Sequence, residues 1–252
     1  MIASLPMYER RETAETLDAL WAGVHLRLPF NAPDWLTREG CLWDHWGNPN
    51  LVLSQTCGLP YRARLIGKMQ LVASPDNRLS GCPAGHYNSV FVVRRDDPRS
   101  DLAAFADAPL AYNEPLSQSG WAAPYNHAAG LGFAFSNPVY TGAHVNSART
   151  LAEGRVDIAC IDAVSWRLIQ RHDAHASTLR ELGRTAPTPA PPFITAQGRD
   201  VAAIAAALCG AIDALTPEAR DIIGLYGLVQ IPNAQYLAIP NPPEPGAPRQ
   251  NG

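Results

Sequence analysis

The chain has 252 residues, of which 46% are hydrophobic, and a formal net charge of −3. This length is enough to bury a sizeable core in one large domain or in two smaller lobes. The near-neutral charge gives no reason to expect a nucleic-acid or anionic-membrane partner, and no apolar run approaches the ~18–20 residues of a membrane-inserted helix.

Short apolar runs bounded by turn residues predict strands, and apolar residues at helical spacing predict helices between them. In chain order, we expect strands at 2–7, 51–53, 69–74, 87–95, 108–112, 139–141, 156–161, 178–184 and 193–195. We expect helices at 11–24, 102–105, 121–131, 142–153, 163–171, 200–215 and 217–223. This alternation predicts an α/β fold with a largely parallel sheet. The Pro-rich segment 186–192 is expected to be a linker, and 240–252 a flexible tail.

The five cysteines are widely spaced and form no Cys-x-x-Cys motif. Their odd number argues against a disulfide framework, and their spacing argues against a structural zinc site. Reduced thiols suit the cytoplasm. Residues 1–8 lack the basic region, apolar stretch and cleavage site of an export signal. We therefore expect a cytoplasmic location for the chain as given, or a periplasmic one if a leader is missing.

The stretch Ser117-Gln118-Ser119-Gly120 lies between the strand at 108–112 and the helix at 121–131. The first N–H groups of a helix have no partner within the helix and carry partial positive charge. Hydroxyl groups and a glycine at this point are therefore typical of an anion-binding site. Serine is also a favoured helix cap at any surface, so an ordinary cap is the alternative interpretation.

A second stretch of this kind follows the strand at 51–53. It reads Ser54-Gln55-Thr56-Cys57-Gly58 and again joins a strand to a helix. In open α/β sheets, ligands bind at the carboxyl ends of the strands, so the two helix starts are expected to face each other. Tyr8 and Tyr61 follow loops at the same sheet edge and are expected to form walls of the site.

Several motifs together resemble a known family. They are Ser117–Gly120 followed by Pro124, Thr141-Gly142-Ala143-His144, and the segment 152–159 leading to Asp162. On these motifs, nearly the whole chain resembles the type II periplasmic-binding-protein-like substrate-binding proteins of phosphate, phosphite and phosphonate ABC transporters.

The resemblance implies two α/β lobes joined by two crossing strands and closing around the ligand. One lobe would contain residues 1–88 and 190–252, and the other, inserted lobe residues 89–189. In the family, a Ser-x-Ser-Gly helix start grips the phosphonate oxygens, a Gly-x-His helix start adds an imidazole, and an acidic residue faces the same cleft. Residues of this chain in these roles would be Ser117, Ser119, Gly120, His144 and Asp162.

We therefore expect a non-enzymatic binding protein for a small phosphate- or phosphonate-like anion, acting as the substrate-binding component of an ABC transporter. The resemblance implies a monomer, with an ABC permease as partner. No metal or cofactor is expected. The candidate ligand-binding residues are Ser54, Gln55, Thr56, Ser117, Gln118, Ser119, Gly120, His144, Asp162, Tyr8 and Tyr61.

Other interpretations of single residues stay open. His144 would add positive charge if protonated, or it would serve only as a helix cap. Asp162 directly precedes the helix at 163–171 and is itself a possible cap. A cytoplasmic enzyme or ligand sensor on the same scaffold is the alternative function, with Cys57 as nucleophile and His144 as base.

Overall fold

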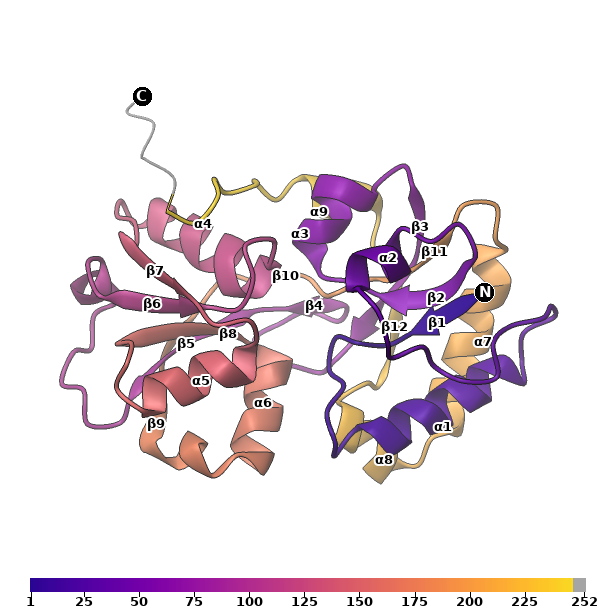
Figure 1. Ribbon diagram of the computed structural model, residues 1–252, viewed down its shortest axis with the longest axis horizontal. Coiled ribbons are helices and arrows are strands. Elements are labelled where there is room, and N and C mark those ends of the chain that lie inside the picture. The colour runs from indigo at the N-terminus through magenta and orange to yellow at the C-terminus, as the bar shows by residue number, and fades with distance from the viewer. Residues whose placement is uncertain (247–252) are drawn as a thin grey trace. The chain divides into compact units, whose positions relative to one another are not determined.

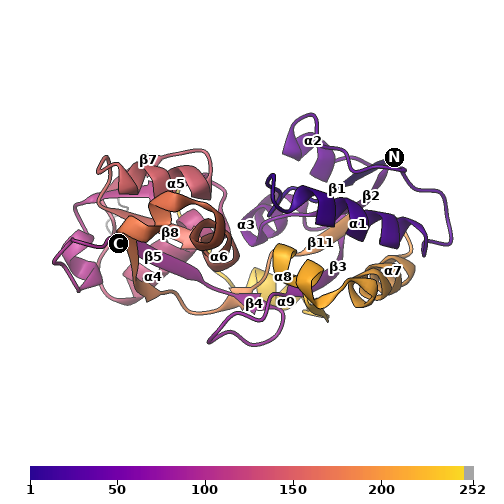
Figure 2. The ribbon, with the colours of Figure 1, turned by 90° about the horizontal axis from the view of Figure 1, so that it is seen from below.

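The computed structural model describes residues 1–246, and the chain forms two units, shown in two views in Figures 1 and 2. Unit 1 contains Met1–His86 and Pro189–Ala238. Unit 2 contains Tyr87–Thr188 and the described residues from Ile239 onward. The chain therefore passes between the units three times.

Two of these passages are short strands that pair with each other. They are β4 (His86–Tyr87) and β10 (Thr188–Pro189), which form a two-stranded sheet. Beside them, the Ala190 N–H donates to the Gly85 carbonyl at 2.9 Å. These are the two crossing strands that the family resemblance implies.

The third passage, at Ala238–Ile239, differs from the expected division, in which 190–252 belonged to the first lobe. Residues 239–246 group with unit 2 because two side chains of that unit hold them. Trp121 Nε1 donates to the Pro243 carbonyl, and Asn126 Nδ2 donates to the Pro240 carbonyl. Of the tail expected at 240–252, residues 247–252 lie outside the described part of the chain.

The sheet of unit 1 has the strand order β1-β2-β11-β3-β12. Its strands are β1 (Ile2–Ser4), β2 (Leu51–Gln55), β3 (Met69–Asp76), β11 (Phe193–Ala196) and β12 (Gly227–Val229). β1 and β2 are parallel, whereas β11 is antiparallel to both β2 and β3. The indigo N-terminal and orange C-terminal parts of the chain therefore lie side by side (Figure 1).

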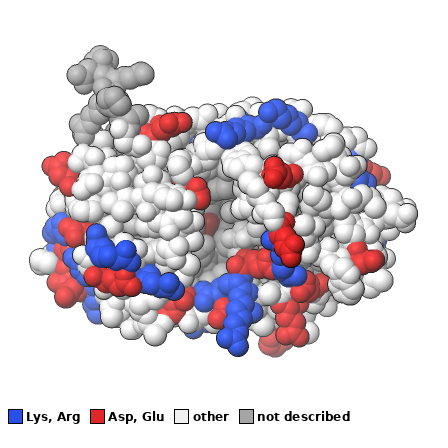
Figure 3. Space-filling view, in the orientation of Figure 1, with Lys and Arg blue, Asp and Glu red and all other residues white. Residues whose placement is uncertain are grey.

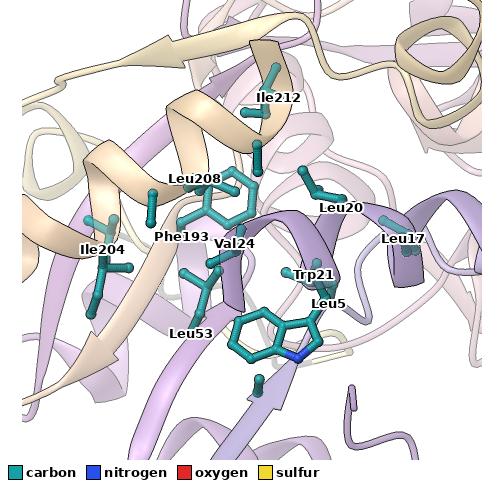
Figure 4. Packing of buried hydrophobic residues seen from close by; sticks show 14 of the residues in the cluster. Leu5, Leu17, Leu20, Trp21, Val24, Leu53, Phe193, Ile204, Leu208 and Ile212 are labelled. Atoms are coloured by element: carbon teal, nitrogen blue, oxygen red, sulfur yellow. The ribbon is translucent and has the colours of Figure 1, made fainter. Parts of the chain in front are cut away.

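The helices of unit 1 pack on both faces of this sheet. They are α1 (Ala14–His25), α2 (Leu42–Trp46), α3 (Gly58–Pro60), the π-helix η1 (Tyr61–Leu65), α7 (Val201–Ala214), α8 (Pro217–Ile223) and α9 (Asn233–Leu237). Neighbouring residues of β11 point to opposite faces, so Phe193 and Ile194 belong to two different buried clusters. Figure 4 shows the first cluster, in which α1 and α7 meet over the strands through Leu20, Trp21, Val24, Leu53, Phe193, Ile204, Leu208 and Ile212.

The sheet of unit 2 has the order β7-β6-β8-β5-β9. Its strands are β5 (Ser89–Arg94), β6 (Pro109–Tyr112), β7 (Asn137–Tyr140), β8 (Ile158–Asp162) and β9 (Leu179–Arg184). β6 is parallel to β7 and β8, but β5 is antiparallel to β8 and β9. Both large sheets are thus mixed, which corrects the expectation of a largely parallel sheet. β5 follows the crossing strand β4, and β11 follows the crossing strand β10. Each of them runs antiparallel to both of its neighbours in the sheet.

Helices cover both faces of the unit 2 sheet, with α4 on one face and α5 and α6 on the other (Figure 1). The helical segments are η2 (Leu102–Phe105), the π-helix η3 (Gln118–Ala122), α4 (Ala123–Gly130), α5 (His144–Ala152), α6 (Ala163–His172) and η4 (Ala174–Thr178). All residues of β8 and all but the last residue of β5 are buried, and alternate residues of β5, such as Phe91 and Val93, lie in the cluster that includes Trp121. Burial on both faces explains why the central strands have continuous apolar sequences.

Among the described residues, no single helix is long and apolar enough to cross a membrane. Together, α7 and α8 reach the necessary length and apolar composition, but the chain bends by 117° between them. Acidic and basic side chains of the described residues are interspersed on the face shown in Figure 3.

Candidate functional site

Ser117 begins the helix that carries the candidate anion-binding turn. β6 ends at Tyr112, and the helix starts at Gln118 as the π-helix η3 and continues as α4. Ser117 has extended backbone angles (φ −83°, ψ 127°), and its Oγ accepts a hydrogen bond from the Gly120 N–H at 2.9 Å. Ser119 Oγ lies 3.4 Å from Ser117 Oγ. The turn therefore has the helix cap that the sequence offered as an alternative, with a second hydroxyl next to it.

Gly120 is required by a close approach to Asn113. A Cβ placed on Gly120 would lie 1.9 Å from Asn113 Oδ1 and 3.1 Å from its Cγ. Asn113 Oδ1 is buried and has no hydrogen-bond partner among the described residues. The sequence interpretation did not select Asn113, and this contact makes it part of the turn.

His144 is the partner of Ser119. It is the first residue of α5, and its Nε2 lies 2.9 Å from Ser119 Oγ. The end of β7 brings it there, because Thr141 Oγ1 donates to the Tyr112 carbonyl at 2.8 Å and Gly142 then turns the chain with a φ of +82°. The structure thus brings together two of the predicted residues that are 25 positions apart.

The imidazole of His144 is uncharged near neutral pH. The residue as a whole is only partly buried, but its Nδ1 atom is enclosed and has no partner among the described residues. Burial lowers the pKa of His144 to about 3, because an enclosed imidazolium loses its hydration. His144 therefore meets Ser119 as a neutral hydrogen-bonding group in this structure.

Asp162 acts as the cap of α6. It ends β8 and is buried, and its Oδ1 accepts hydrogen bonds from the backbone N–H groups of Val164 at 2.7 Å and Ser165 at 2.9 Å. Two N–H donors at a helix start stabilise a carboxylate in a buried place. This oxygen therefore has the structural role that the sequence allowed for it.

Of the three candidates at the end of β2 in unit 1, two are engaged within the unit. Ser54 Oγ is 2.9 Å from Ser4 Oγ, and Gln55 Nε2 donates to the Pro191 carbonyl at 3.0 Å. Thr56 differs from them because its Oγ1 is buried with no hydrogen-bond partner among the described residues.

The two candidate tyrosines have different surroundings. Tyr8 lines a small cavity of unit 1 together with Gln55 and Asn77. Tyr61 is buried in the core, where its hydroxyl donates to Asn233 Oδ1 at 2.6 Å and burial raises its pKa. In this structure Tyr61 is part of the core of unit 1 and not an open wall, because η1 turns its ring inward against Tyr236.

Between residues 1 and 246, no group of three or more His, Cys, Asp or Glu side chains has an arrangement suited to holding a metal ion. Cys57 is buried at the start of α3. The residues that the structure brings together, Ser117, Ser119 and His144, supply two hydroxyls and an imidazole at a helix start, and such a combination suits recognition of an oxyanion.

Comparison with known proteins identifies the family. A family profile described as "ABC transporter, phosphonate, periplasmic substrate-binding protein" matches residues 57–236. The chain belongs to this family. Its members are substrate-binding components of transporters and not enzymes, so the alternative with Cys57 as nucleophile is not favoured. The matched range includes Ser117–Gly120, His144 and Asp162, and it begins directly after Thr56.

Solved structures of other proteins share the fold, and three of them serve as examples. PhnD1 from Prochlorococcus marinus MIT 9301, in complex with methylphosphonate, matches with a TM-score of 0.71 at 14% identity, covering 93% of each chain. PA3383 from Pseudomonas aeruginosa, a binding protein component of an ABC phosphonate transporter, has a TM-score of 0.64 at 14% identity, covering 95% of this chain and 83% of that chain. XAC2383 from Xanthomonas citri, bound to ATP, has a TM-score of 0.63 at 17% identity, covering 93% and 92%. No curated protein sequence matches the chain.

Proposed function

We propose that this protein binds a phosphate- or phosphonate-like oxyanion as the periplasmic substrate-binding component of an ABC transporter. The observation that carries the proposal is the helix start at Ser117–Gly120, with Ser119 held by a neutral His144. PhnD1, which shares the fold, was solved with methylphosphonate. A working partnership with an ABC permease and a monomeric state belong to the same proposal.

The tautomer of His144 determines what Ser119 offers to the anion. A proton on Nδ1 would be a buried N–H without an acceptor, which is rarer in proteins than a lone pair without a donor. The proton therefore belongs on Nε2, which donates to Ser119 Oγ. The Ser119 hydroxyl hydrogen is then available to the ligand, so the site presents donors and no fixed positive charge.

Thr56 is the residue of unit 1 that we propose for the same anion, in a cleft between the two lobes. Its support is the buried hydroxyl without a partner among the described residues, directly after the strand β2. Ser54 and Gln55 would act indirectly, by holding the end of β2 through their bonds to Ser4 and Pro191.

Calorimetric titration and thermal shift with phosphate, phosphite, methylphosphonate, sulfate and small carboxylates test the proposal. We expect saturable binding of a phosphorus oxyanion and a loss of about tenfold or more in Ser119→Ala, because a hydrogen bond to a charged ligand contributes about 1.5–3 kcal/mol. Ser136→Ala is the matched control, since Ser136 is an exposed serine of unit 2 whose Oγ bonds Asp107. Absence of binding to every anion, or equal binding by Ser119→Ala and the wild type, would contradict the proposal.

A further inference from the structure

The segment 239–246, named here the C-terminal strap, is attached to the helix that carries the anion-binding turn. Its Pro243 carbonyl accepts from Trp121 Nε1 at 2.8 Å, and its Pro240 carbonyl accepts from Asn126 Nδ2 at 3.1 Å. Trp121 directly follows Gly120. The strap therefore holds the residue next to the turn.

Trp121 also fixes the other end of the loop that forms the turn. Its ring lies 5.5 Å from the ring of Tyr112, which ends β6 just before the loop, and 6.0 Å from the ring of Tyr125 in α4. Trp121 is only 4% exposed. A buried indole N–H needs an acceptor, and the Pro243 carbonyl supplies it. The position of this ring, and with it both ends of the loop, therefore depends on the strap.

The composition of the strap suits this role. Prolines at 240, 242, 243 and 245 each restrict the backbone φ angle, so the strap loses less conformational entropy on docking than an ordinary segment would. Such a segment can hold a side chain in place with only a few hydrogen bonds.

We propose that the C-terminal strap is a positioning element for the anion-binding turn, acting through the Trp121–Pro243 hydrogen bond. Without Pro243, the Trp121 N–H would lose its acceptor or the ring would turn toward water. Either change shifts Gly120 and Ser119 away from the binding geometry and lowers the population that is competent to bind. The effect on the ligand rests on the function proposed above, whereas the hydrogen bond itself does not.

Two shortened chains test the strap by calorimetry with methylphosphonate and inorganic phosphate. A chain ending at Ala238 removes the strap, and a chain ending at Gly246 is the matched control because it keeps it. We expect affinity to fall by about five- to tenfold in the first, the equivalent of one hydrogen bond, and to be unchanged in the second. Wild-type affinity in the chain ending at Ala238 would overturn the proposal.

A double-mutant cycle isolates the hydrogen bond. Trp121→Phe keeps most of the ring but removes the N–H, so we expect it to weaken binding and to add little to the shortened chain, because both changes break the same bond. Trp166→Phe is the control, since Trp166 Nε1 donates to Glu181 in the same unit. Independent, additive effects of Trp121→Phe and the truncation would contradict the coupling. If the chain ending at Ala238 fails to fold, Trp121→Phe in the full chain decides the question by its affinity.

A measurement without ligand separates this proposal from the proposed function. The indole N–H signal of Trp121 in an ¹H–¹⁵N spectrum, assigned by its loss in Trp121→Phe, should exchange slowly with solvent in the full chain and quickly in the chain ending at Ala238. Equal exchange in the two chains would overturn the strap. If the full chain binds neither anion, the proposed function fails while the indole exchange still decides the strap.

Discussion

Gly120→Ala should destabilise unit 2 because the new methyl group would overlap Asn113. The Cβ would lie 1.9 Å from Asn113 Oδ1, a separation that carbon and oxygen do not reach without a bond. The Asn113 amide can rotate away, but its Cγ at 3.1 Å and its backbone nitrogen at 3.3 Å keep the site tight. Overpacking of this kind costs about 1–3 kcal/mol. In urea, with a typical dependence of about 2 kcal/mol per molar, the unfolding midpoint should fall by roughly 1 M.

Gly130→Ala, at the other end of the same helix, is the matched control. No atom lies within 4 Å of a Cβ at Gly130, so alanine should be neutral or stabilise the helix by up to about 1 kcal/mol. Asn113→Ala combined with Gly120→Ala should recover much of the loss, because the overlapping amide is gone. A wild-type midpoint for Gly120→Ala, or no recovery in the double variant, would refute the reasoning.

Two further predictions concern pH. The pKa of His144 is lowered in the folded chain, so below pH 6.5 the unfolded chain binds the extra proton first and stability should fall toward pH 3. Between pH 7.5 and pH 5, the free energy of unfolding measured in urea should therefore fall by up to about 2 kcal/mol more in the wild type than in His144→Gln. An equal fall in the two proteins would contradict the neutral imidazole. Arg99→Ala removes the ion pairs to Asp97 and Asp157 and the contact with the Phe105 ring, and should cost about 1–3 kcal/mol. The Arg99 guanidinium holds the pKa of Asp97 at about 2, so this contribution to the free energy of unfolding of the wild type should be lost only as the pH falls from about 4 to 2. If Arg99→Ala unfolds in acid with the same pH dependence as the wild type, Arg99 does not stabilise the ionised Asp97.

The sequence predicted the turn at Ser117–Gly120 because a strand, a hydroxyl cap and a helix follow one another locally. The family resemblance assigned Ser119 and His144 to one site, since no spacing rule joins residues on different helices, but it did not predict the hydrogen bond between them. Asn113 was missed because a single amide in a loop has no periodic pattern. The one sequence feature that pointed to it was Gly120, a glycine in the first turn of a helix. The structure explains this glycine, because the folded loop brings Asn113 against it.

Strand direction and the C-terminal strap were beyond local patterns. β5 and β11 are apolar runs like their neighbours, and their antiparallel orientation depends on the crossings that precede them. Residues 239–246 have a composition typical of mobile tails, and the indole N–H that holds them is more than a hundred positions away in the sequence. Tyr61 was expected at a wall because it follows a loop at the sheet edge, and the sequence does not indicate that it begins the π-helix η1 and is buried there.

The division of unit 1 into two chain segments has a consequence for the order in which the protein is made. The strands of the unit 2 sheet all lie between Ser89 and Arg184, so this sheet can be completed while the rest of the chain is still being synthesised. The sheet of unit 1 lacks its central strand until Phe193–Ala196 has left the ribosome, and its edge strand until Gly227–Val229 follows. During synthesis β2, which pairs with β1, therefore waits with one edge unpaired, and β3 waits with both edges unpaired, for strands that arrive after the inserted unit has had time to fold.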